Sequence, residues 1–115
     1  MSSREYDQPE KRIESWLNEQ IRKMGGISYK FVSPMNPGVP DRIYLMPGGA
    51  VWFVELKTEI GRLANIQKWQ GDRIRGIGCR YRVIKGMDQA RAFVEELNRD
   101  CRSYGLDSMK EGDDK

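Results

Sequence analysis

Three ionisable residues, Asp41, Glu55 and Lys57, occur in a stretch of the sequence that is otherwise largely apolar. Two neighbouring carboxylates repel each other unless a positive charge neutralises them. A divalent cation does this, and Mg²⁺ takes one or two carboxylates together with waters and substrate phosphates. A lysine beside such an ion can orient or deprotonate a water, or neutralise charge that develops on a phosphate. If the fold gathers these residues, they predict metal-assisted phosphodiester hydrolysis, which needs no histidine.

A β-hairpin is predicted to bring the three residues together. The runs DRIYLM (41–46) and VWFVELK (51–57) are rich in strand-forming residues and are separated by Pro-Gly-Gly-Ala. If the turn is centred on the two glycines, residue 41 lies opposite residue 56, within one position. Because side chains alternate along a strand, the three ionisable groups share one face. The backbone carbonyl of Leu56 lies between Glu55 and Lys57 and is a further candidate metal ligand. The other face is apolar: Trp52, Val54 and Leu56.

The absence of histidine narrows the possible chemistry. The chain has 115 residues and no histidine, which excludes Ser-His-Asp and Cys-His catalysis and histidine-based zinc sites. The two cysteines, Cys79 and Cys101, could pair or stay reduced, but they are too few for a disulfide framework or a zinc site. Any catalysis must therefore come from carboxylates, lysine, tyrosine, cysteine or an oxygen-ligated metal.

The same residues also fit a purely structural interpretation. Asp41 could cap a turn after Pro40, and Glu55 with Lys57 could be a surface ion pair worth under about 1 kcal/mol. The proline-rich loop PMNPGVP (34–40) favours the chemical interpretation, because it places an acid at the rigid start of a strand.

Basic residues are concentrated in the second half of the chain. The net charge is only +3, yet seven lysines and arginines and a single acid, Asp72, lie between Ile60 and Gly86. This stretch predicts a surface that faces phosphates, the alternative being a solvated helix face. Lys68, Asp72 and Arg75 are spaced so that they share one face of a helix. The candidate DNA contacts on or near that helix are Arg62, Lys68, Arg73 and Arg75.

The remaining patterns predict a small α/β domain. Apolar residues at helical spacing indicate helices from Pro9 to Met24, over about 65–75, and after Gly86. The middle helix is expected to make its apolar contacts through Leu63, Ile66, Ile74 and Ile77, with Trp69 or Gln70 between them. Strands are expected over 27–33, 41–46, 51–57 and 79–84. The order α-β-β-β-α-β-α indicates a mixed four-stranded sheet flanked by helices.

The length predicts one domain. Residues 1–8 are expected to be a flexible N-terminus, 9–104 the folded domain, and 105–115 an acidic, disordered tail. The longest apolar run, Ala50–Val54, is far too short for a membrane span, and the N-terminus does not resemble a secretory signal. A cytoplasmic protein without membrane contact is therefore expected.

Longer stretches of the sequence resemble a known family. Pro40-Asp41, followed after thirteen residues by Glu55-Leu56-Lys57, resembles the PD-(D/E)xK nuclease pattern. The segments GVPDRIYLMPGG, VWFVELKTEIGRLANIQKWQ and IRGIGCRYRVIKG resemble the VRR-NUC (virus-type replication-repair nuclease) family. The resemblance covers about residues 9–98 and implies a restriction-endonuclease-like fold, in agreement with the predicted order of elements.

The resemblance also implies roles for individual residues. Asp41 and Glu55 would be metal ligands and Lys57 the catalytic lysine. The glutamate that the family carries on its first helix would be Glu10, with Glu14 as the alternative. The family also carries a glutamine after the strand that ends in Glu-x-Lys. In this chain it would be Gln67, which would hold the substrate or order the site.

One departure from the family concerns the start of the helix over 65–75. Relatives often carry serine or threonine at the N-cap, where this chain has Ala64. Asn65 is expected to take the capping role instead.

The function implied by the resemblance is a Mg²⁺- or Mn²⁺-dependent DNA endonuclease that acts on branched DNA such as a four-way junction. Family members of this size are often phage-encoded, which would place them in the host cytoplasm, and are homodimeric. Two symmetric cuts need two sites related by a two-fold axis. Two alternatives remain: a non-catalytic DNA-binding module with the same fold, and an interaction domain whose acidic tail binds a basic partner.

Overall fold

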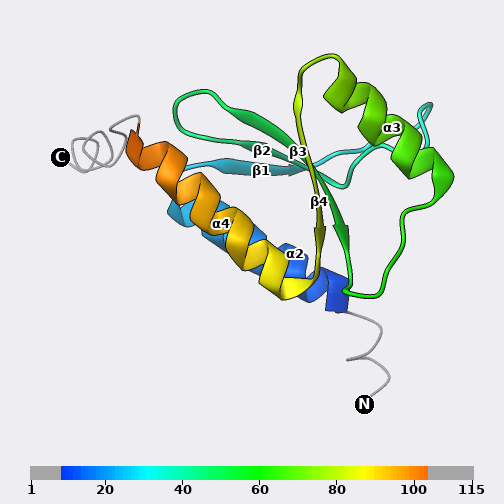
Figure 1. Cartoon of the computed structure of the whole chain (residues 1–115). Coiled ribbons are helices and arrows are strands. Elements are labelled where there is room, and N and C mark those ends of the chain that lie inside the picture. Colours follow the sequence, from blue (N-terminus) through cyan, green and yellow to red (C-terminus); the bar gives the residue numbers. More distant parts are fainter. Residues whose placement is uncertain (1–8, 104–115) are drawn as a thin grey trace.

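The computed structural model describes residues 9–103, which form a four-stranded sheet with helices on both faces (Figure 1). The predicted order α-β-β-β-α-β-α is confirmed. The predicted flexible N-terminus and acidic tail lie outside the described residues. The elements are α2 (Pro9–Lys23), β1 (Ile27–Lys30), β2 (Arg42–Leu45), β3 (Val51–Lys57), α3 (Asn65–Gly76), β4 (Arg80–Lys85) and α4 (Gly86–Ser103).

The sheet is mixed, in the strand order β1-β2-β3-β4. The first three strands form an antiparallel meander, and β4 pairs with β3 in parallel. A parallel pair needs a crossover connection, and α3 supplies it. The carboxyl end of β3 therefore lies beside the start of β2 and near the first turn of α3.

Helices α2 and α4 lie side by side and cover one face of the sheet (Figure 1). The apolar alternation predicted for β3 is observed, since Trp52, Val54 and Leu56 are buried in the core.

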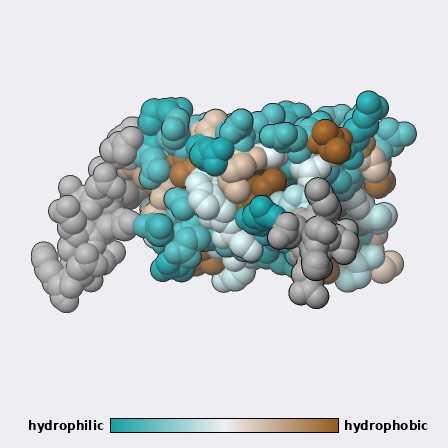
Figure 2. Space-filling view, turned by 90° about the horizontal axis from the view of Figure 1, so that it is seen from below, coloured by the Kyte–Doolittle hydropathy of each residue, from teal (hydrophilic) through white to brown (hydrophobic). Residues whose placement is uncertain are grey.

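Cys79 and Cys101 are not joined by a disulfide. Seen from below, the surface is mostly polar, with a few separate apolar residues (Figure 2). None of the helices in the described part of the chain is both long and apolar enough to cross a membrane. The helices contribute these core residues: Ile13, Leu17, Ile21, Ala90, Phe93, Val94, Leu97 and Cys101.

Helix α3 packs on the opposite face of the sheet, but only partly through the residues that its sequence predicts, since Leu63 and Ile74 are half-buried. Ile66 is 41% exposed and Ile77 is 81% exposed, whereas Gln70 and Gly71 are buried. A Cβ at Gly71 would lie only 2.4 Å from Cζ of Tyr81. The expected apolar contacts are wrong at Ile66 and Ile77, because the glycine brings a different side of the helix against the sheet.

Several element boundaries differ from the prediction by one to three residues; the second strand, for example, covers 42–45 rather than 41–46. The first strand ends at Lys30, three residues early, since only one further backbone hydrogen bond, from Phe31 N to Asp41 O (2.9 Å), precedes the proline-rich loop. The last strand is shifted by one residue, to 80–85. The N-cap of α3 is Ala64, without a side-chain cap, so the expectation that Asn65 caps the helix is wrong. Asn65 is already the first helical residue.

The hairpin between β2 and β3 closes over three residues rather than two. Met46 N donates to Ala50 O at 2.8 Å, and Gly49 N donates to Met46 O at 2.9 Å. Pro47 and Gly48, which has a φ of +92°, suit the central positions of a type II turn. The odd number of loop residues shifts the predicted register by one, so that Arg42 pairs with Val54. Continued by one residue, this register sets residue 41 opposite residue 55, not 56.

Candidate active site

The candidate site lies where β2 begins and β3 ends. Asp41 directly precedes β2, and Glu55 and Lys57 are among the last three residues of β3, at the end away from the hairpin turn. Glu10 comes from the first turn of α2, and Gln67 comes from the first turn of α3. Residues far apart in the sequence are therefore brought to one end of the two central strands, β2 and β3.

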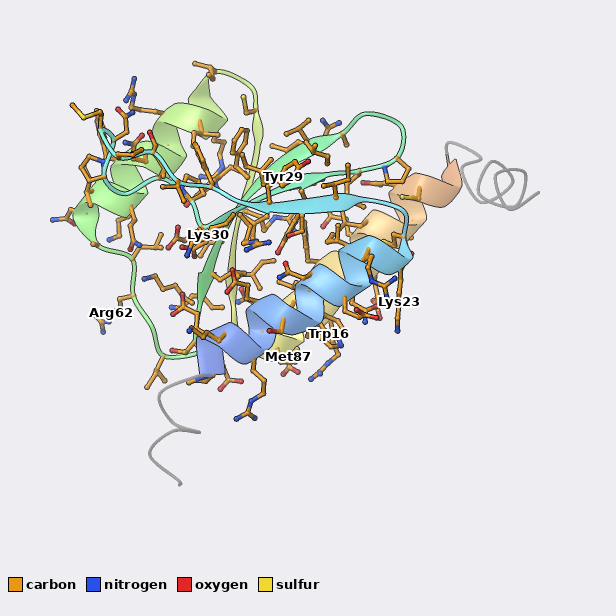
Figure 3. The ribbon with its side chains drawn as sticks, turned by 180° about the vertical axis from the view of Figure 1, so that it is seen from behind. Trp16, Lys23, Tyr29, Lys30, Arg62 and Met87 are labelled. Atoms are coloured by element: carbon orange, nitrogen blue, oxygen red, sulfur yellow. The ribbon has the colours of Figure 1, made fainter. Side chains whose placement is uncertain are left out.

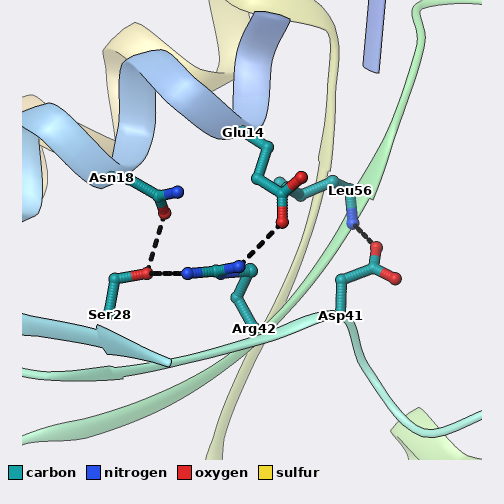
Figure 4. A network of polar contacts seen from close by, with 6 residues as sticks. All are labelled: Glu14, Asn18, Ser28, Asp41, Arg42 and Leu56. Carbon is teal, nitrogen blue, oxygen red and sulfur yellow. Dashed lines mark hydrogen bonds and ion pairs between the residues drawn. The ribbon is translucent and has the colours of Figure 1, made fainter. Parts of the chain in front are cut away.

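Asp41 is fixed through both its backbone and its side chain. Its carbonyl accepts the Phe31 N–H, and its Oδ2 accepts the Leu56 N–H at 2.8 Å (Figure 4). Burial raises the pKa of the Asp41 carboxyl, while the Leu56 N–H and the charge of Lys57 act in the opposite direction. The side chain thus bridges two strands next to Glu55 and retains a second carboxylate oxygen for another contact.

Glu55 is a buried acid with polar partners. The residue is only 1% exposed. Its Oε2 accepts a hydrogen bond from Gln67 Nε2 at 2.9 Å and lies 3.9 Å from Lys57 Nζ. Burial, followed by the charge of Asp41, raises the pKa of Glu55 to about 8. A cation between the two carboxylates would favour the ionised form of both.

Glu10 and Glu14, the two glutamates in the first half of α2, have different surroundings. Both line a pocket of about 360 Å³ together with Asp41, Leu56 and Lys30. Glu14 Oε2 forms an ion pair with Arg42 Nη1 at 2.9 Å. The pKa of Glu10 is raised, first by burial and then by the charge of Asp41, whereas Lys57 lowers it. The charge of Glu10 therefore interacts with Asp41 and Lys57, while Glu14, whose charge also raises the pKa of Asp41, is paired with an arginine.

A polar network that the sequence analysis missed holds α2 to the sheet (Figure 4). Arg42 Nη2 donates to Ser28 Oγ at 2.7 Å, and Ser28 Oγ donates to Asn18 Oδ1 at 2.8 Å. Together with the Glu14 pair, these contacts connect α2, β1 and β2 directly beside Asp41. Strand alternation offered a signal, because it places Arg42 on the same face as buried Tyr44, where a charged residue needs a partner.

Gln67 connects the start of α3 to the buried acid. Its Oε1 accepts the Ala64 N–H at 2.8 Å, so its Nε2 is directed to Glu55. The family resemblance offers two roles for Gln67, to hold the substrate or to order the site. The hydrogen bond observed here is made to a residue of the site.

The four basic residues assigned to DNA contact are all exposed. Arg73 lies over the Trp69 ring at 4.6 Å, and Arg75 lies over the Tyr81 ring at 4.9 Å. Figure 3 shows Arg62 projecting outward from the segment between β3 and α3. Lys68 is on α3 with Arg73 and Arg75. The helix and the segment before it therefore present a basic surface next to the candidate site.

Two of the seven bases in the stretch from Ile60 to Gly86, Arg80 and Arg82, do not belong to that surface. Arg80 lines a small pocket with Leu97 and Cys101 of α4. Arg82 forms two hydrogen bonds with Glu96, of 2.9 and 3.0 Å, and lies over Trp52. It is on the face of the sheet that α4 covers.

The donor set at this site fits a hard divalent cation. In residues 9–103, no three acidic, cysteine or histidine side chains are grouped so that they alone could hold a metal ion. Mg²⁺ needs only one or two carboxylates with waters and substrate oxygens. Asp41 and Glu55 supply these, and Glu10 and the Leu56 carbonyl are further oxygen donors nearby. The buried, mutually repelling carboxylate pair is the feature that a cation would relieve.

Comparison with known proteins points in one direction. No family model matches the sequence. The chain is 39% identical over 79 residues to "Putative nuclease p44" of Acyrthosiphon pisum secondary endosymbiont phage 1, a match that covers 69% of this chain and 85% of that protein. A solved "VRR_NUC domain" has a TM-score of 0.71 and 26% identity, over 76% of this chain and 95% of that one. A "VRR_NUC domain protein" has the same fold, with a TM-score of 0.58 and 14% identity over 77% and 87%.

Proposed function

This chain is a phage-type member of the VRR-NUC family of nucleases, and we propose that it is a Mg²⁺- or Mn²⁺-dependent DNA endonuclease. The observation that carries the proposal is the facing pair Asp41 and Glu55 with Lys57 beside it. Glu55 is buried and its pKa is raised to about 8. A buried acid of this kind is costly for the fold and is typical of functional sites.

The metal would be held by the side chains of Asp41 and Glu55, with Glu10 and the Leu56 carbonyl as further ligands. Bound Mg²⁺ or Mn²⁺ supplies positive charge that stabilises phosphate oxygens and lowers the pKa of water. Gln67 would keep the Glu55 carboxylate in one orientation through its 2.9 Å hydrogen bond. The ligand geometry would then be set before the substrate arrives.

Lys57 would act on the reacting phosphate. Its Nζ is 3.9 Å from Glu55 Oε2, and its side chain is 20% exposed, so it borders both the acid and the solvent. From this position the ammonium group would orient the attacking water or neutralise charge that develops on the phosphate oxygens.

The exposed bases on and before α3 would hold the DNA backbone. Arg62, Lys68, Arg73 and Arg75 lie next to the candidate site, and lysine and arginine contacts to phosphates dominate DNA affinity. Such contacts position the duplex without reading its sequence.

We further propose that the substrate is branched DNA and that the enzyme works as a homodimer. Two symmetric cuts across a junction need two sites related by a two-fold axis. The sheet face opposite α2 and α4 offers a contact surface for a second copy. Ile27 pairs with Leu45, and Leu45 pairs with Val51, so these apolar side chains form a row across three strands. Ile27 and Val51 are exposed.

The test of this function is cleavage of a labelled four-way junction and of a matched linear duplex, each with Mn²⁺ or with EDTA. Junction cleavage in Mn²⁺ that EDTA abolishes is the expected result. Tight binding without cleavage would instead identify a non-catalytic DNA-binding module. Light scattering on the same preparation measures whether the protein is dimeric, and Ile27→Lys should reduce the dimer if the apolar row is its interface.

A further inference from the structure

A second groove, of about 560 Å³, lies on the face of the sheet that α3 covers. Phe31 and Phe53 form its floor, with ring centroids 5.8 Å apart. Arg73 and Ile74 of α3 line one side, and residues of the loop 33–39 line the other. The loop is held against the helix by a hydrogen bond of 3.1 Å from the Gln70 side chain to Pro37 O, so both walls are fixed.

The groove adjoins the pocket of about 360 Å³ that Glu10, Glu14 and Asp41 line. Phe31 and Val39 line both. Phe53 and Glu55 are two residues apart on β3 and point to the same face, a separation of about 7 Å. A molecule that occupies the groove is therefore next to the atoms that would hold the metal and the scissile phosphate.

The lining of the groove suits a flat, partly polar ring attached to an anionic backbone. Two half-buried aromatic rings offer faces for stacking. The amide nitrogens of Asn36 and Gln70 already donate to Ser33 Oγ and Pro37 O, so it is the amide oxygen of exposed Asn36 that can accept a hydrogen bond from a ring edge. Arg73 gives the wall a positive charge, which complements a phosphodiester chain. Single-stranded nucleic acids are bound by this combination of basic groups and aromatic platforms.

We propose that this groove binds an unpaired nucleobase of the DNA substrate, next to the phosphate held at Asp41 and Glu55. A base within a continuous duplex has no free face to stack, whereas a base at a bulge, a fork or an open junction does. The inference rests on the proposed nuclease function and narrows its substrate class to DNA with unpaired nucleotides close to the cut.

Gly76 offers a direct way to fill the groove. It is among the lining residues, and a Cβ built there meets nothing within 4 Å. Gly76→Trp should occupy the groove, and Gly76→Ala is the matched control because it makes the same backbone change without bulk. Phe31→Leu is a second, independent variant that keeps an apolar floor but removes the ring. Circular dichroism checks that each variant is folded.

The experiment measures binding without a divalent metal. The probes are a duplex with one 2-aminopurine in a single-nucleotide bulge and the same duplex with that base paired. Wild type and Gly76→Ala should bind the bulged duplex about tenfold more tightly and quench its fluorescence. Gly76→Trp and Phe31→Leu should lose both the preference and the quenching. If Gly76→Trp does not fold, Phe31→Leu carries the same test.

Equal binding of both probes by wild type would overturn the proposal, and so would an unchanged preference for the bulged duplex in the folded groove variants. If the groove variants changed only the oligomeric state and not the binding of the probes, the groove would be a contact between copies instead. Tighter binding of a bulged RNA strand than of the DNA strand would overturn its assignment to DNA. Because binding is measured without metal, it does not depend on cleavage. If neither wild type nor any variant cleaved DNA in Mn²⁺, the proposed nuclease function would be refuted. If wild type cleaved DNA but did not bind the unpaired base, only the proposed role of the groove would be refuted.

Discussion

The side-chain amide of Gln67 donates a 2.9 Å hydrogen bond to Oε2 of buried Glu55 while its carbonyl oxygen accepts the Ala64 N–H. One side chain thus joins the first turn of α3 to the candidate metal site. The helix needs this contact because Ala64 has no side chain that can cap it. The site needs it because a buried carboxylate requires hydrogen-bond donors.

Replacing Gln67 by leucine should therefore damage both the helix and the site. Loss of the Glu55 partner and of the Ala64 contact should lower the free energy of unfolding by roughly 1–3 kcal/mol. DNA cleavage should fall mainly through kcat, because the carboxylate is less well oriented while the basic surface is intact. Urea unfolding and steady-state cleavage measure the two effects. An exposed neighbour, Lys68→Leu, is the control for stability, and a Gln67→Leu variant with wild-type kcat would argue against a positioning role.

The buried acid predicts an unusual pH dependence for the metal-free protein. The pKa of Glu55 is raised from 4.5 to about 8, so the folded chain holds this proton more tightly than the unfolded chain. The free energy of unfolding should then fall as the pH rises from about 4.5 to about 8. Glu55→Gln should remove most of this decline, leaving the variant more stable than wild type near pH 8. Thermal unfolding in EDTA across this range is the measurement, and parallel profiles for the two proteins would contradict the assignment.

Glu10 and Glu14 should respond differently to the same substitution. Glu10→Gln should weaken Mn²⁺ binding and cleavage with little loss of stability, because the charge of this glutamate interacts with Asp41 and Lys57. Glu14→Gln should leave Mn²⁺ affinity unchanged but cost roughly 1–3 kcal/mol of stability, since it breaks the 2.9 Å pair with Arg42. Calorimetry and thermal unfolding on the two variants distinguish them. The reverse pattern would make Glu14 the helix ligand.

Phosphate contacts along α3 should appear in the salt dependence of DNA binding. Each contact contributes about 0.9 to the slope of log affinity against log salt, so the double variant Lys68→Ala/Arg75→Ala should flatten the slope by up to about 1.8. Affinity should fall for all sequences alike, and Mn²⁺ affinity should not change. The control is Arg22→Ala/Arg91→Ala, which removes two exposed bases from α2 and α4. A wild-type slope in the first variant would place the DNA on another surface.

Local patterns predicted the elements well because their signals are short-range. The alternation of Trp52, Val54 and Leu56 identified the buried face of β3, and the spacing of Ile13, Leu17 and Ile21 identified the buried face of α2. The hairpin register was less certain, because one additional loop residue shifts every pair.

Features that depend on long-range packing could not be predicted in the same way. The contact between Gly71 and Tyr81 decides which side of α3 faces the sheet, and helical periodicity alone favoured Ile66 and Ile77. The Arg42–Glu14 pair joins residues 28 positions apart. Which of the two neighbouring glutamates is held in an ion pair follows from that contact, which is not local in the sequence.

The central claim is that Asp41 and Glu55 hold a divalent cation that Lys57 does not bind. Titration calorimetry with Mn²⁺ on wild type, Asp41→Asn, Glu55→Gln and Lys57→Ala tests it most directly. Each carboxylate variant should remain folded, lose at least about tenfold in Mn²⁺ affinity, which corresponds to about 1.4 kcal/mol, and lose cleavage. Lys57→Ala should keep Mn²⁺ and DNA binding and lose only cleavage. Unchanged Mn²⁺ affinity in both carboxylate variants would contradict the ligand assignment, and a strong loss in Lys57→Ala would mean that the lysine shapes the site rather than serving the reaction.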